Sequence, residues 1–162
     1  MDILSLLKSE QEAVLHSLQE PQGADRECPD TLKNLFASMS ASIREYMAVD
    51  QEFLYLEIEG VLPNASRLSE VGRSHHEKIQ SLLDSVLGQI GTRNSDGILV
   101  EWAALQQEVL SHVRYQQENI IPRMRELIPT QDREDLAEVL QDLKDEWAQR
   151  SPGENPKEQA MV

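Results

Sequence analysis

Apolar residues recur every three or four positions along almost the whole chain, in five successive segments. This spacing places them on one face of an α-helix. Gly and Pro are few, and they gather mainly between the segments or near the chain end. A chain of 162 residues is long enough for one domain with a sizeable core and too short for two comfortable ones. The pattern therefore predicts an all-α single domain.

The segments predict four long helices and one shorter helix. They cover about Asp2 to Gln19, Asp30 to Glu59, Ser66 to Ile90, Ile98 to Ile120 and Thr130 to Gln149. Short turns between long helices favour an antiparallel up-down-up-down four-helix bundle over residues 1–130. The short C-terminal helix, 131–149, should pack on the outside of this bundle, and Pro122 should kink or loosen the end of the fourth helix. Residues 150–162 are polar and contain Pro and Gly, which predicts a disordered tail.

The acidic balance of the chain limits its partners. The formal net charge is −14, whereas a nucleic-acid surface needs clustered Lys and Arg, and an anionic membrane would repel the protein. No apolar run approaches the length of a membrane span, and the first residues lack the character of a signal peptide. A single cysteine, Cys28, leaves no internal disulfide and fits a reducing compartment. We expect a cytoplasmic protein without nucleic-acid or membrane partners.

Six polar residues interrupt the apolar faces at helical spacing: Gln11, Tyr46, Asp50, His76, His112 and Gln116. Each of the four long helices contributes at least one of them. Counted from the same end of the expected bundle, they lie roughly 9 to 16 residues in, within a band about 10 Å thick. Buried polar groups cost free energy unless they form hydrogen bonds or bind a metal. The sequence therefore predicts a shared polar layer in the core.

Within this layer, Asp50, His76 and His112 supply one carboxylate and two imidazoles. This is the ligand set of non-haem Fe(II) sites with open positions, and the same groups also suit Mn or Zn. The residues alone leave two interpretations open. One is a metal site, and the other is a hydrogen-bonded network completed by the amides and the phenol of the same layer.

The other two histidines fall away from these faces. His75 directly precedes His76, so its side chain points about 100° away from that of His76 around the helix. His16 lies off the face that carries Gln11. Both are therefore expected at the surface.

Four segments resemble the helices of the hemerythrin-like (HHE cation-binding) domains: DILSLLKSEQEAV, EYMAVDQEFLYLEIE, SHHEKIQSLLDSV and HVRYQQENIIPRMRELIP. The resemblance covers about residues 2 to 130. It implies a four-helix bundle that holds two irons and handles oxygen, nitric oxide or iron.

The resemblance also implies a ligand set, which this chain carries only in part. The family would have histidines at Gln11, Tyr46, His76 and His112, and bridging carboxylates at Asp50 and Gln116. The two retained histidines serve one iron in the family, and the two replaced ones serve the other. One bridging carboxylate has become an amide, which is a weak and neutral ligand. We therefore expect at most one Fe or other divalent metal, with Tyr46 as a phenol hydrogen-bonded to Asp50.

Two functions remain open from the sequence. The first is a hemerythrin-like binding or sensing protein with an incomplete metal site and a small gaseous ligand. The second is a metal-free interaction or regulatory module that uses its acidic surface. An exposed apolar side of the C-terminal helix would permit a homodimer. No nucleophile motif or phosphate-binding loop is present, so an enzyme is not expected.

Overall fold

The structure, a computed structural model, describes residues 1–23, 29–90 and 95–150. All regular elements in these ranges are helical, which confirms the all-α prediction. The elements are α1 (Ile3–Ser17), the short 3₁₀ helix η1 (Glu20–Gly23), α2 (Pro29–Val49), the π-helix η2 (Asp50–Leu54), α3 (Tyr55–Glu59), α4 (Ala65–Gln89), α5 (Ser95–Asn119), α6 (Ile121–Leu127) and α7 (Thr130–Gln149). Cys28, most of the expected turn after Ile90 and nearly all of the expected tail lie outside the described residues.

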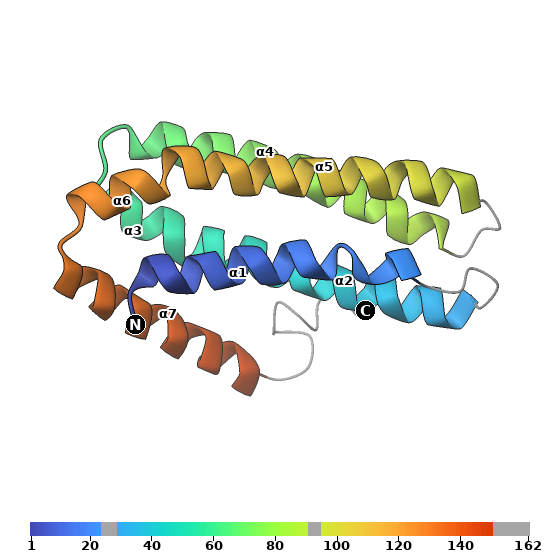
Figure 1. Ribbon diagram of the computed structural model, residues 1–162, viewed down its shortest axis with the longest axis horizontal. Helices are drawn as coiled ribbons and strands as arrows, with labels where there is room; N and C mark the ends of the chain where they lie inside the picture. Colours follow the sequence, from blue (N-terminus) through green and yellow to red (C-terminus); the bar gives the residue numbers. More distant parts are fainter. Residues whose placement is uncertain (24–28, 91–94, 151–162) are drawn as a thin grey trace.

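The long helices lie lengthwise beside one another, and α7 lies at an angle to them (Figure 1). Helix α4 packs along α5, and α1 packs along α2. Local signals fix where these helices begin. The carboxylate of Asp2 accepts a hydrogen bond of 2.8 Å from the backbone N–H of Leu4 and so caps α1. Asn64 takes a left-handed conformation, with φ of 59°, immediately before α4.

The second expected helix is interrupted by the π-helical turn η2, which begins at Asp50. In this turn the backbone N–H of Tyr55 bonds to the carbonyl of Asp50, five residues earlier. By comparison with an uninterrupted α-helix, the wider turn changes the direction in which every later side chain points around the helix axis. As a result Leu54 and Tyr55 are both buried directly after Phe53. The sequence pattern did not predict this shift.

The fourth expected helix breaks where the proline was expected to disturb it. Helix α5 ends at Asn119, and α6 starts at Ile121 with Pro122 in its first turn. Proline has no backbone N–H, so it fits the first turn of a helix and not its interior.

The polar layer separates two apolar clusters of the core. Along α1, Leu7 belongs to one cluster and Val14 to the other, with the buried Gln11 between them. Val113 of α5 and Ile120, directly after this helix, are divided in the same way, with Gln116 between them. The predicted layer is therefore present, and it lies in the interior of the molecule.

Helix α7 packs against α1, and Leu136 and Leu143 on this helix are partly buried against the core. Its buried side chains are Ala137, Leu140 and Trp147, and the indole N–H of Trp147 donates to Oε2 of Glu52 at 3.1 Å. Val139 on the same helix is 50% exposed. None of the helices in the described ranges combines the length and apolarity needed to cross a membrane.

Candidate metal centre

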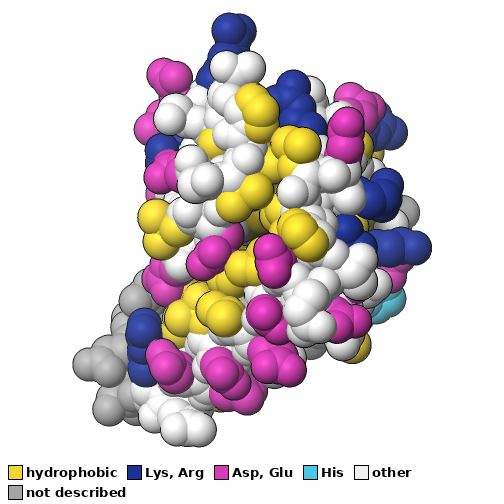
Figure 2. All heavy atoms as spheres, turned by 90° about the vertical axis from the view of Figure 1, so that its left-hand side faces the viewer, with side chains coloured by type: hydrophobic (Ala, Val, Ile, Leu, Met, Phe, Trp, Pro, Cys, Tyr) yellow, Lys and Arg dark blue, Asp and Glu magenta, His cyan; other side chains and the backbone are white. Residues whose placement is uncertain are grey.

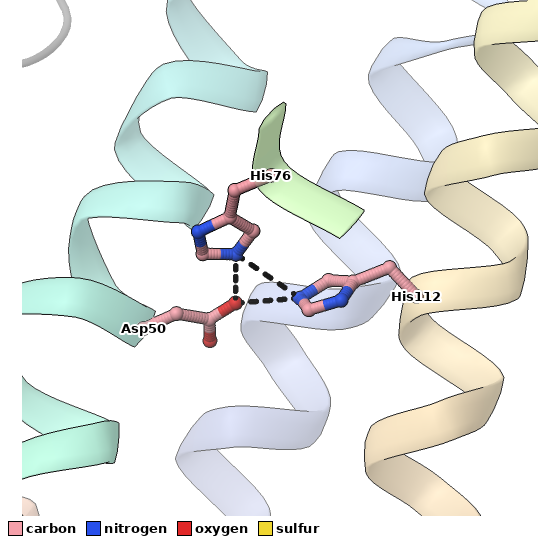
Figure 3. A group of neighbouring side chains, drawn as sticks. All are labelled: Asp50, His76 and His112. Carbon is pink, nitrogen blue, oxygen red and sulfur yellow. Dashed lines mark hydrogen bonds and ion pairs between the residues drawn. The ribbon is translucent and has the colours of Figure 1, made fainter. Parts of the chain in front are cut away.

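Three side chains from three helical elements converge at the centre of the polar layer. Asp50 comes from the start of η2, His76 from α4 and His112 from α5 (Figure 3). All three are buried, with exposed fractions of 1%, 3% and 0%. Oδ2 of Asp50 lies 2.9 Å from Nε2 of His76 and 2.7 Å from Nε2 of His112, and the two nitrogens lie 3.2 Å apart. The structure thus brings together the three residues that the sequence singled out.

No placement of protons gives a good hydrogen bond along all three sides of this triangle. If both Nε2 atoms carry a proton and donate to Asp50, the two N–H groups of His76 and His112 face each other. If one Nε2 is unprotonated, its lone pair faces the carboxylate oxygen of Asp50. Every assignment therefore leaves one short side without a well-formed hydrogen bond. A cation between the three atoms would interact favourably with all of them.

The carboxyl of Asp50 is ionised at neutral pH. Burial alone would raise its pKa, but the hydrogen bonds from His112 and His76 outweigh this effect and leave the pKa below the ordinary value. The centre therefore combines a buried negative charge with two imidazoles, which is a donor set suited to a divalent cation.

Gln116 joins Gln11 and Tyr46 with itself into one hydrogen-bonded group. Its Oε1 accepts from the Tyr46 hydroxyl at 2.5 Å and from Nε2 of Gln11 at 3.2 Å. Its Nε2 donates to Oδ1 of Asp50 at 2.7 Å. One half of the polar layer is thus filled by amides and a phenol that satisfy one another.

Tyr46 acts as a neutral hydrogen-bond donor in this group. Burial and the charge of Asp50 raise its pKa well above the ordinary value for tyrosine, so the phenol keeps its proton. The sequence had predicted a hydrogen bond from this phenol to Asp50, but the hydroxyl donates to Gln116 instead. The phenol therefore reaches the carboxylate only through the amide.

The expectation that His75 lies at the surface is wrong. His75 is half-buried, and its Nδ1 lies 3.0 Å from Nδ1 of His112, on the side of that ring away from Asp50. The close packing of α4 on α5 turns this position toward α5 instead of toward solvent. Burial and the nearby His112 lower the pKa of His75, which keeps its imidazole neutral at pH 7. His16 is exposed, as expected.

Gln51 contacts the outer nitrogen of the other histidine and was missed by the sequence analysis. Its Nε2 lies 2.9 Å from Nδ1 of His76. The only signal for it in the sequence is a polar residue directly after Asp50. We refer to Asp50, His76 and His112 as the triad. Both of its histidines therefore have a polar side chain behind the ring, Gln51 for His76 and His75 for His112.

Tyr55 is a further residue beside the centre that the sequence did not indicate. Its side chain is fully buried, with its ring centroid 5.7 Å from that of His76. Burial and the charge of Asp50 raise its pKa, whereas Gln116 lies close enough to lower it. Within the described residues, however, the hydroxyl forms no hydrogen bond of acceptable geometry. It lies against Gly72, where the Cβ of any larger residue would stand 2.0 Å from the hydroxyl oxygen.

Comparisons with known proteins identify no family for this chain. No protein-family model, no curated protein and no solved structure matches it. The function is therefore argued from the geometry of the centre.

Proposed function

We propose that this chain is a hemerythrin-like binding or sensing protein that holds a single divalent metal, most naturally Fe(II), through Asp50, His76 and His112. The proposed scaffold is an antiparallel up-down-up-down four-helix bundle with α7 on its outside. Two observations support this scaffold. The long helices lie side by side (Figure 1), and the polar layer lies between two apolar clusters along them.

The convergence of three ligand atoms is the observation that carries the proposal. A metal about 2.1 Å from each of three ligand atoms, with bonds at right angles, places those atoms about 3.0 Å apart. The measured sides of the triangle, 2.7, 2.9 and 3.2 Å, fall on both sides of this value. The arrangement suits the two-histidine, one-carboxylate face of an octahedral site, which leaves further positions open.

The unpartnered hydroxyl of Tyr55 supports an additional ligand at such an open position. A buried hydroxyl without a hydrogen bond costs about 1–3 kcal/mol. Water or a small gaseous ligand bound next to His76 could accept a hydrogen bond from it. A bound metal would supply Lewis-acid or redox chemistry to that ligand.

The amide group around Gln116 supports one metal rather than two. Its oxygen already accepts from two donors, and its nitrogen donates to Asp50. An amide used in this way has little capacity left to bridge two cations. Gln11 and Tyr46, the positions of the lost histidines, are the two donors.

Metal analysis after anaerobic loading with Fe(II) tests the proposal. We expect about one Fe per chain, bound to the full-length protein after gel filtration. His112→Ala and His76→Ala should each abolish retention, because two ligands hold a divalent metal weakly. His16→Ala is the matched control, since this histidine is exposed and lies outside the polar layer. It should retain the metal like the unaltered protein.

Anomalous scattering from crystals of the loaded protein locates the metal. A single peak between Asp50, His76 and His112 is expected. No Fe, Mn or Zn in the loaded protein, or a peak elsewhere, would overturn the proposal.

The second candidate is a metal-free interaction or regulatory module. It is favoured by the amide group, because Gln11, Tyr46 and Gln116 form hydrogen bonds with protein groups alone. In that case His76→Ala would change the stability of the protein and leave the binding of its partner unaltered.

A further inference from the structure

A groove at one end of the molecule carries features that the metal centre does not explain. It lies where α3, the turn after it and the junction of α6 with α7 meet, and none of the triad residues lines it. Its volume is about 280 Å³. Figure 2 shows this end of the molecule, with hydrophobic side chains through its middle and Asp and Glu gathered over its lower part. We refer to this feature as the end groove.

The end groove presents apolar side chains to solvent. Val61 and Val139, which line it, are each 50% exposed. Leu136 lies one turn before Val139 on α7 and is itself only partly buried against the core. Residues three apart on a helix share a face, so α7 offers an apolar ridge at this place. A volume of about 280 Å³ lies at the lower limit of ligand pockets and suits one or two inserted aliphatic side chains.

The rim of the end groove is negative. Glu57, Asp132 and Asp135 line it, and no Lys or Arg of the described residues does. Both basic residues of α7 face the other way. Arg133 pairs with Asp2 at 2.8 Å, and Lys144 pairs with Glu10, so both cations are held against α1.

We infer that the end groove binds a basic amphipathic helix of a partner protein. The apolar side chains of this helix would enter the groove, and flanking Lys or Arg side chains would meet Glu57, Asp132 and Asp135. The charge argues against a second copy of this chain. Two such grooves face to face would bring together like charges on proteins that each carry a net charge of −14. This inference is independent of the proposed metal.

A synthetic peptide provides the probe for the full-length protein. It is an amphipathic helix of about five turns, with Leu on one face and Lys on both sides of that face. We expect binding in fluorescence anisotropy that weakens as salt is added, because salt screens the charged rim. Amide chemical-shift changes should be concentrated at α3, the following turn and the start of α7.

Substitutions at two exposed valines separate the groove from general surface attraction. Val139→Asp should weaken peptide binding at least tenfold. Val100→Asp, at a valine of α5 that is 70% exposed, introduces the same charge elsewhere and should change binding less than twofold. Both positions are at least half exposed, so neither substitution should prevent folding.

Three results would overturn the inference. The first is equal loss of peptide binding in Val139→Asp and Val100→Asp. The second is a dimer in sedimentation that Val139→Asp dissociates, which would assign the groove to a second copy. The third is peptide binding that strengthens on deletion of residues 151–162, together with changes of the amide chemical shifts at the groove on that deletion. This result would assign the groove to the chain's own C-terminal segment.

Discussion

Gln116 donates from Nε2 to Oδ1 of Asp50 at 2.7 Å, so the other carboxylate oxygen, Oδ2, faces the two histidines. The same amide accepts two hydrogen bonds at its oxygen. Only one orientation of the amide satisfies these three contacts together. The contact between Gln116 and Asp50 therefore divides the polar layer into two halves. In one half, protein groups satisfy one another's hydrogen bonds. In the other half, the carboxylate and the two imidazoles point toward one place.

Gln116→Glu should destabilise the metal-free protein by about 3 kcal/mol. The new carboxylate would face Oδ1 of Asp50 at hydrogen-bond distance in a place that is only 2% exposed. Two like charges cannot both remain ionised there without cost. Urea unfolding without metal measures the loss. Loading with Fe(II) should restore a large part of it, because the added carboxylate is an additional ligand.

Gln107→Glu makes the same change at an exposed position of α5 and is the control. Its free energy of unfolding should stay within about 0.5 kcal/mol of the unaltered protein. If Gln116→Glu is equally mild, the contact between Gln116 and Asp50 does not have the role described above.

Substitutions of Gln51 should change metal affinity in opposite directions. His76 can bind a metal through Nε2 only when its Nδ1 carries the proton, which then needs an acceptor behind the ring. The side-chain oxygen of Gln51 serves after rotation of the amide, and a carboxylate serves better. Gln51→Glu should tighten Fe(II) binding about tenfold, and Gln51→Leu should weaken it about tenfold, as measured by competition with a chromophoric chelator.

Gln19→Glu adds the same charge at an exposed position near the end of α1 and controls for long-range attraction. It should leave the affinity within about twofold. Equal affinities for Gln51→Glu and Gln51→Leu would show that the residue does not position His76.

Much of the site could be predicted because it depends on regular geometry. Helical spacing alone placed Asp50, His76 and His112 on inward faces, and similar depths along the helices placed them in one layer. The structure brings the same three residues together. The regular spacing of apolar residues within each helix is therefore enough to predict that these three side chains meet.

The surroundings of the triad could not be predicted, because they depend on how the helices are rotated and how closely they approach. His75 contacts His112 only because α4 packs closely along α5. The burial of Tyr55 follows a π-turn that adds a residue to the helix, which no apolar spacing signals. Gly72 becomes informative only once Tyr55 is known to lie against it.

The metal-free protein should lose stability on acidification through Asp50. Its pKa in the folded state lies below the ordinary value of 3.8. The unfolded chain therefore takes up the proton first as pH falls. The contribution of this carboxylate to stability is complete above about pH 5 and is lost as pH falls below about 4. Urea unfolding across this range should show a steeper decline for the unaltered protein than for Asp50→Asn, and equal slopes would contradict the assignment.

Two glycines of α4 provide a matched test of the packing beside the centre. A Cβ at Gly72 would stand 2.0 Å from the hydroxyl oxygen of Tyr55 and 2.5 Å from its Cζ, whereas a Cβ at Gly88 would meet nothing within 4 Å. Alanine favours a helix over glycine by about 1 kcal/mol. Gly88→Ala should therefore raise the free energy of unfolding by about 0.5–1 kcal/mol.

Gly72→Ala should instead lower the free energy of unfolding by about 2 kcal/mol, because the Tyr55 ring must move out of a filled space. That ring also lies against His76, so the same substitution should weaken Fe(II) binding, whereas Gly88→Ala should leave it unchanged. Urea unfolding and chelator competition on both variants measure the two effects. A Gly72→Ala protein as stable as Gly88→Ala would show that Tyr55 is not held against α4, and unaltered metal binding in a destabilised Gly72→Ala protein would separate Tyr55 from the metal centre.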